Sequence, residues 1–136
     1  MSNISDLKKI EIDYHIKQWD TPYRSTVFFY EFVKKYLKKS NKVIDLGCGI
    51  GSNTYYISNF HKKCKFIGID YSKKYIEIGN NIVNSKNSKN LRLIKDDCFN
   101  LKNYTLRFTD EQILIHIFRT LPWISWTSCV SLGYTT

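Results

Sequence analysis

Apolar residues in the first third of the chain recur at helical spacing. In the stretch "STVFFYEFVKKYLKKSNK" they form two rows with members four residues apart, Phe28, Phe32 and Tyr36 in one row and Phe29, Val33 and Leu37 in the other. Side chains at this spacing share one face of a helix, so the stretch predicts a helix with a buried stripe. Ser25 is placed to cap its start, and the lysines near its end suit the negative end of the helix dipole.

Short apolar runs then alternate with further helical patterns. "KVIDLG", "CKFIGID" and "NLRLIKDD" are rich in β-forming residues and predict three strands. One helix is expected between the first two strands, from after Gly51 to about Phe60. A second should begin at the N-cap Ser72, and one of its faces carries Tyr75, Ile78, Gly79, Ile82 and Val83.

Alternating strands and helices predict an α/β fold, a three-layer sandwich in which helices cover both faces of a mostly parallel sheet. We expect the first three strands in the order 3-2-1, and "ILIHIF" is a possible fourth. Each of the three strands ends in an acid, at Asp45, Asp70 and Asp97. Core packing does not call for acids there, whereas ligands of such sheets bind at the carboxyl ends of the strands.

Three glycines follow the first strand at alternate positions, Gly47, Gly49 and Gly51. They allow a sharp turn and close approach of a ligand to the backbone, and the next helix offers free N–H groups. A dinucleotide fingerprint, G-x-G-x-x-G, would need glycine where Ser52 stands. Asp45 would also repel a pyrophosphate, so the turn favours a ligand that has an ammonium and a carboxylate but no phosphate.

These residues resemble the motifs of a known family. "VIDLGCGIG" resembles the first motif of class I S-adenosylmethionine-dependent methyltransferases, "FIGIDYS" the second and "LRLIKDDCFNL" the third. "WDTPYRS" is similar to a segment that precedes this domain in some small-molecule methyltransferases. The resemblance covers roughly residues 14 to 104. It implies an incomplete Rossmann-like domain with S-adenosyl-L-methionine as cofactor.

The resemblance also implies roles for individual residues. Asp70 would bind the two ribose hydroxyls, Asp97 would meet the adenine amino group, and Cys98 would be the next backbone contact. The residues expected to bind the cofactor are Asp45, Gly47, Cys48, Gly49, Gly51, Asp70, Tyr71, Asp97 and Cys98. Methyl transfer from a sulfonium needs mainly alignment of donor and acceptor, so no catalytic residue is assigned.

The resemblance and the patterning divide the chain into three parts. Residues 1–41 would form an N-terminal helical lid, 42–104 the cofactor-binding half domain, and 105–136 an atypical tail. Four lid residues either close over the donor or hold a substrate: Tyr14, Trp19, Tyr23 and Arg24. The alternative is that Trp19 and Tyr23 are packing residues of this helical lid.

The tail departs from the family pattern. Lysine occurs 17 times up to Lys102 and never in residues 103–136. The acid-containing pattern expected after a fourth strand is missing. The N-P-P-[YFW] signature of nucleic-acid methyltransferases that methylate amino groups is missing as well. Either the chain is a natural short form with an apolar tail, or the reading frame slips near Tyr104; the second explanation is favoured. The domain is therefore expected to be truncated.

The net charge of +9 raises the question of a nucleic-acid partner. The lysines come in separate pairs such as Lys34–Lys35 and Lys62–Lys63, and the chain is rich in the residues of A/T-rich codons. Nucleic acid is therefore a possible but not a favoured partner, and a focused basic face would change this.

Other features exclude several classes of protein. The four cysteines are far apart and the three histidines have no partner at metal spacing, so we expect no metal site and reduced thiols in a cytoplasmic protein. No signal peptide is expected at the start. His116, Arg119 and Pro122 interrupt the most apolar stretch, so no membrane span is expected either.

The sequence therefore predicts a methyltransferase that acts on a small molecule by in-line methyl transfer. One alternative is a remnant that binds the cofactor, or nothing, without turnover. Another is an RNA methyltransferase, which charge alone favours. The substrate, the acceptor atom and the oligomeric state are left open.

Overall fold

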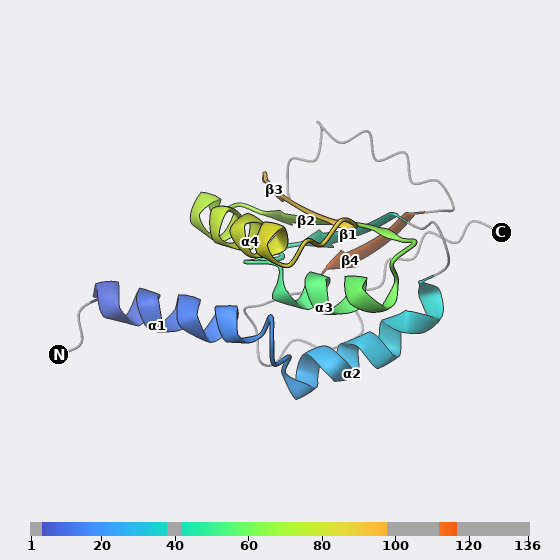
Figure 1. The fold of residues 1–136 in the computed structure, drawn as a ribbon, viewed down its shortest axis with the longest axis horizontal. Coiled ribbons are helices and arrows are strands. Elements are labelled where there is room, and N and C mark those ends of the chain that lie inside the picture. Colours follow the sequence, from blue (N-terminus) through green and yellow to red (C-terminus); the bar gives the residue numbers. More distant parts are fainter. Residues whose placement is uncertain (1–3, 38–41, 98–111, 117–136) are drawn as a thin grey trace.

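The computed structural model describes residues 4–37, 42–97 and 112–116 (Figure 1). The helices and strands in chain order are α1 (Ile4–Lys17), α2 (Arg24–Val33) with the 3₁₀ turn η1 (Lys34–Tyr36), β1 (Lys42–Leu46), α3 (Ser52–Phe60), β2 (Lys65–Asp70), α4 (Lys73–Ser85), β3 (Leu91–Lys95) and β4 (Gln112–His116).

The strands form one sheet in the order β3-β2-β1-β4, and every pairing is parallel. The α/β class and the order 3-2-1 of the first three strands are confirmed. A fourth strand, largely within "ILIHIF", lies beside β1, and its register runs from Lys42↔Gln112 to Leu46↔His116. In the described sheet β1 is therefore an inner strand.

Helices α3 and α4 lie on the same face of the sheet. Both crossovers step in the same direction along the sheet, and right-handed connections then place their helices on one side. Alternate strand residues join these helices in one core, which includes Val43, Phe66, Leu91, Leu93, Ile57, Ile76 and Val83. Helices were expected on both faces of the sheet. Among the described residues, α3 and α4 form the helical layer on one of these faces.

The start of α2 differs from the expectation. The helix begins at Arg24, and its N-cap is Tyr23, whose backbone is extended and whose side chain makes no capping bond. The prediction that Ser25 is the N-cap is therefore wrong. Because Arg24 is already helical, Ser25 lies inside the first turn of α2. The regular α-helix ends at Val33, before the lysines.

The apolar stripe of α2 is also narrower than expected. Val33 and Leu37 are buried, but Phe28 and Phe32 are 63% and 41% exposed. Helix α2 packs against α3 along one side, so only the row that contains Val33 reaches the core. The row that contains Phe28 and Phe32 faces away from the core.

Helix α4 follows the prediction closely. Ser72 is its N-cap, and the Ser72 hydroxyl accepts a hydrogen bond from the Tyr75 N–H at 3.3 Å, as expected. Gly79 is buried where α4 crosses the glycine turn. A Cβ at this position would lie 2.4 Å from the Ile50 carbonyl oxygen. The helix can approach the turn this closely only because residue 79 has no side chain.

No helix within residues 4–37, 42–97 and 112–116 is long and apolar enough to cross a membrane.

Candidate functional site

The glycine turn connects β1 to α3 at the carboxyl edge of the sheet. The φ angles of Gly47, Gly49 and Gly51 are +74°, +59° and +84°, in the left-handed region that other residues rarely adopt. Gly51 is the N-cap of α3. The backbone conformation therefore strongly favours glycine at all three positions.

Strand β2 holds the start of this turn in place. The backbone N–H groups of Gly47 and Cys48 both donate to the Ile69 carbonyl, at 2.8 and 3.1 Å, and the Gly51 N–H donates to the Cys48 carbonyl at 3.0 Å. These bonds fix the loop against the end of the neighbouring strand.

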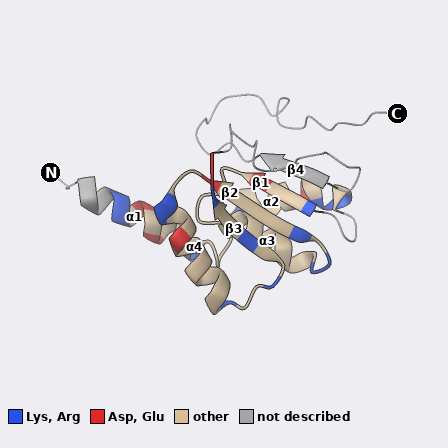
Figure 2. Ribbon diagram, turned by 90° about the horizontal axis from the view of Figure 1, so that it is seen from above, with Lys and Arg blue, Asp and Glu red and all other residues tan. Residues whose placement is uncertain are grey.

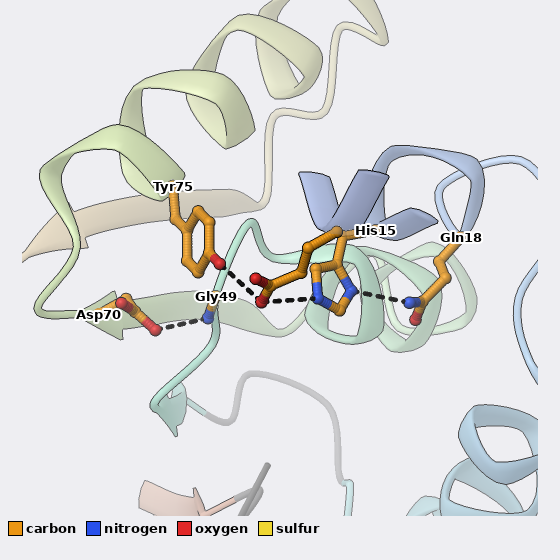
Figure 3. A network of polar contacts seen from close by, with 6 residues as sticks. His15, Gln18, Gly49, Asp70 and Tyr75 are labelled. Atoms are coloured by element: carbon orange, nitrogen blue, oxygen red, sulfur yellow. Dashed lines mark hydrogen bonds and ion pairs between the residues drawn. The ribbon is translucent and has the colours of Figure 1, made fainter. Parts of the chain in front are cut away.

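Asp70 brings the first two sequence motifs together. One of its carboxylate oxygens accepts a hydrogen bond from the Gly49 N–H at 2.7 Å (Figure 3). The other accepts from the Ser72 N–H at 2.9 Å. The carboxylate, which is half-buried, thus lies at the glycine turn and at the start of α4.

Asp45 lies deeper than the other acids of this edge. Only 2% of it is exposed, and its carboxylate accepts a hydrogen bond from the Thr54 hydroxyl of α3. Sequence reasoning did not single out Thr54. The available signal was its position on the inward face of α3, one turn before the buried Ile57 and Ser58.

The third strand also ends beside the second. The Asp96 N–H donates to the Asp70 carbonyl at 3.1 Å, and the Asp97 N–H donates to the Asp96 carboxylate at 2.7 Å. Tyr71 is 71% exposed, and the Lys95 ammonium lies 5.2 Å from the centre of its ring. Cys98, also expected at this site, lies outside the described residues.

Cys48 is buried beneath the glycine turn. A Cβ added to Gly68 of β2 would lie 2.8 Å from the Cys48 sulfur, so this side chain fills the space that Gly68 leaves. The placement fits a packing role under the turn.

The expected lid residues fall into two groups. Trp19 is buried, with its ring centroid 4.7 Å from that of Tyr55 in α3, which fits the packing alternative for Trp19. The rings of Tyr14 and Tyr23 lie 4.8 Å apart. Desolvation, then the hydrogen bond and charge of Tyr14, raise the pKa of Tyr23 to about 12. Arg24 is exposed at the first residue of α2.

A polar network fastens α1 to the first turn of α4 (Figure 3). The Tyr75 hydroxyl donates to a Glu11 carboxylate oxygen at 2.8 Å, and His15 Nε2 lies 3.7 Å from the same oxygen. The Gln18 amide nitrogen lies 3.0 Å from His15 Nδ1. Sequence reasoning missed Glu11, because its partner Tyr75 is 64 residues away.

A second contact joins the linker after α1 to the end of α4. The Lys86 ammonium lies 2.5 Å from the Asp20 carboxylate, and this hydrogen bond raises the pKa of Lys86.

Among the residues described, no group of three or more histidine, cysteine or acidic side chains is arranged to hold a metal ion.

Comparison with known proteins identifies the family. A family described as "Methyltransferase domain" matches residues 37–120, which is more than half of the chain. The chain belongs to this methyltransferase family. The expected family is confirmed. The match also extends past Tyr104 and includes β4.

One relative of the methyltransferase domain is "Uncharacterized protein RP028" of Rickettsia prowazekii (strain Madrid E). It is 38% identical over 52 residues, which are 38% of this chain and 21% of that protein. The match thus spans about a fifth of the relative's length.

Solved structures of methyltransferases are similar as well. A SAM dependent methyltransferase from Aquifex aeolicus is 28% identical, with 71% of this chain and 48% of that chain covered and a TM-score of 0.49. A putative sarcosine dimethylglycine methyltransferase from Galdieria sulphuraria is 13% identical, with 54% and 28% covered and a TM-score of 0.50. This last likeness shows the shared fold alone.

Proposed function

We propose that the carboxyl edge of β1, β2 and β3 binds S-adenosyl-L-methionine and that the protein transfers its methyl group to a small molecule. The hydrogen bond from the Gly49 N–H to the Asp70 carboxylate carries the proposal. It joins the two motifs that the family resemblance assigns to the cofactor, which lie 21 residues apart in the sequence.

The residues of this edge suit such a ligand. The three glycines of the turn carry no side chain, so a ligand can approach the backbone of the turn closely. The Asp70 carboxylate can accept hydrogen bonds from two adjacent ribose hydroxyls in place of the Gly49 N–H. Asp45 lies beneath the turn, where its charge favours the ammonium of an amino acid.

The adenine end of the site falls to the third strand. Asp97 follows β3 and is linked through Asp96 to the backbone of Asp70, so it stands next to the proposed ribose site. Tyr71 offers an exposed ring on the same edge. We assign the adenine amino group to Asp97, with Tyr71 and Cys98 as further cofactor contacts.

Methyl transfer requires mainly that the donor and the acceptor be aligned. The cofactor supplies a methyl group already activated on a sulfonium, and the protein holds donor and acceptor in line while water is kept out. Helix α1 is suited to the covering role, because Glu11 and Tyr75 hold it at the first turn of α4, beside Asp70. In this lid, residues 1–41, we assign acceptor contacts to Tyr14, Tyr23 and Arg24.

The choice of a small-molecule acceptor rests on the "WDTPYRS" segment, which leads into α2. RNA as the methyl acceptor lacks support from the site, since the carboxyl edge carries Asp45, Asp70, Asp96 and Asp97. These charges would repel a phosphate backbone.

The decisive variant is Asp70→Ala. Loss of hydrogen bonds to a charged group costs about 1.5–3 kcal/mol, so we expect S-adenosylhomocysteine to bind roughly 10- to 150-fold more weakly, measured by calorimetry. Glu77→Ala is the control, because it removes an exposed acid of α4 that pairs only with Lys73 among the described residues. Equal affinity of wild type and Asp70→Ala would remove Asp70 from the site.

Turnover is measured separately, as transfer of a labelled methyl group into a mixture of small amines, phenols and carboxylates. Binding of S-adenosylhomocysteine without any transfer would support the remnant that lacks turnover.

A further inference from the structure

Lysines from separate segments gather at the amino edge of the sheet, opposite the site described above. Lys42 and Lys65 begin β1 and β2 and are partners in the parallel register. Lys62 and Lys63 belong to the connection from α3 to β2, and Lys89 to the connection from α4 to β3. These five residues are called the basic edge. Figure 2 shows the basic positions in blue along the strand starts and their loops.

Hydrogen bonds hold the two connections of the basic edge together. The Asn90 side-chain amide donates to the carbonyls of Ser58, His61 and Cys64, at 3.0, 3.2 and 3.3 Å. The loop that carries Lys89 is therefore bonded to the loop that carries Lys62 and Lys63. Adjacent strands lie about 4.8 Å apart, which places Lys42 beside Lys65.

The positive charge of this edge is not compensated within the part of the chain that the structure describes. All five lysines are exposed, and residues 42–44, 60–66 and 86–92 include no acid. None of the five forms an ion pair with a described residue, and Lys62 donates only to the neutral Asn59 side chain at 2.7 Å. The carboxyl edge also carries lysines, but there they stand beside four aspartates.

An exposed aromatic ring lies next to these lysines. Phe60 ends α3 and is 56% exposed. Its ring stacks on Tyr30 of α2, with centroids 4.8 Å apart and planes 22° apart, and it meets the Tyr56 ring at 5.2 Å. Phe60 is thus the outer member of an aromatic stack, two residues before Lys62.

We propose that the basic edge binds single-stranded nucleic acid, with its lysines at successive phosphates and Phe60 against a base. Lysines that neutralise phosphates release counterions, and an aromatic ring stacks on any base, so this binding is independent of sequence. A membrane fits the geometry less well. Phe60 lies flat on Tyr30 rather than projecting outward, and the lysines follow a sheet edge rather than one face of an amphipathic helix.

This surface is separate from the proposed cofactor site. The five residues of β1 span about 17 Å between the basic edge and the glycine turn. The proposal therefore does not depend on methyl transfer, and S-adenosylhomocysteine should bind equally well with and without the basic edge.

The test is fluorescence polarisation with a labelled twelve-residue oligouridylate, over roughly 50–300 mM potassium chloride. For the wild type we expect log K to fall linearly with log salt concentration. The variant Lys62→Gln, Lys63→Gln, Lys65→Gln should bind at least tenfold more weakly at the lowest salt. The slope of log K against log salt concentration should be less steep by about 2, since three contacts are lost and each phosphate contact on a single strand contributes about 0.7.

The matched control removes the same charge from α1, in Lys8→Gln, Lys9→Gln, Lys17→Gln, whose lysines are also exposed. Its slope should equal that of the wild type, and circular dichroism should show that both triple variants are folded. Equal weakening by the two triple variants would mean that net charge alone attracts the oligonucleotide, and the basic edge would not be a site.

Phe60→Leu separates stacking from charge. It keeps an apolar side chain on Tyr30 but removes the ring, so affinity should fall about fivefold or more while the salt slope is unchanged. Absence of salt-dependent binding in the wild type would overturn the proposal. So would binding to phosphatidylglycerol vesicles, lost in the edge variant, without binding to the oligouridylate.

Discussion

Thr54 supports the most deeply buried acid of the candidate site. Its hydroxyl donates to the Asp45 carboxylate, which is 2% exposed, so this donor offsets part of the cost of burying the acid. Thr54→Val keeps the shape of the side chain and removes the hydroxyl. We expect it to lower the free energy of unfolding by about 1–3 kcal/mol, measured by urea denaturation.

Thr54→Ser is the control for this change. It keeps the donor and loses one methyl group, which should cost about 1 kcal/mol or less. If valine and serine were equally destabilising, the hydrogen bond to Asp45 would contribute nothing measurable.

Single residues show what the sequence could and could not predict about the site. Asp45, Asp70 and Asp97 were expected at one edge, because parallel strands end together and the glycines mark which end carries the turn. Thr54 and Glu11 were missed. Their partners depend on how α3 and α1 are rotated against the rest of the fold, and spacing along one helix carries no information on that rotation.

Helix α4 packs closely against the glycine turn at Gly79. Gly79→Ala would place a Cβ 2.4 Å from the Ile50 carbonyl oxygen and 2.5 Å from a Leu93 methyl group. The backbone atom cannot give way, so α4 must move outward. We expect a loss of about 1–3 kcal/mol in a thermal or urea melt, although alanine is the better helix former.

Asn84→Ala, on the exposed side of α4, controls for helix propensity and should be neutral or slightly stabilising. Gly79→Ala should also weaken S-adenosylhomocysteine binding, because Ile50 belongs to the turn. A fully stable Gly79→Ala variant would show that α4 can shift at little cost.

The helices also mark the limit of reasoning from periodicity. The N-cap of α4 was predicted, and so were two of its three buried residues, Gly79 and Val83. Ile76, the third, was missed. In α2 two apolar rows have the same spacing, and nothing local decides which is buried. The contact with α3 selects the row that contains Val33 and leaves Phe28 and Phe32 exposed.

At the scale of the whole chain, the segment after Tyr104 contributes β4, the strand that pairs with the outer side of β1. Strand β4 pairs with all five residues of β1. A chain that ends at residue 104 would leave β1 with a single partner, and the loss is expected to rival the whole stability of about 5–15 kcal/mol. We expect it to lose the cooperative thermal transition that a chain ending at residue 120 keeps.

The comparison of these two shortened chains also tests the hypothesis of a reading-frame slip near Tyr104, which stays a prediction. The three domain boundaries stay predictions as well. The family match runs to residue 120 and includes β4, which argues for residues 112–116 as part of the evolved sheet. If both shortened chains melted alike, the segment from 105 to 120 would be dispensable, as a frame slip near Tyr104 predicts.

The strand order β3-β2-β1-β4 also has a consequence for biosynthesis. The ribosome makes β1, β2 and β3 first, and β4 follows only after the 16 residues 96–111. At roughly 5–20 residues per second this gap lasts about one to three seconds. During that time the outer edge of β1 has no partner and can pair with an edge of another nascent chain. Translation speed between Asp96 and Glu111 therefore sets how long each new molecule is exposed to misassembly.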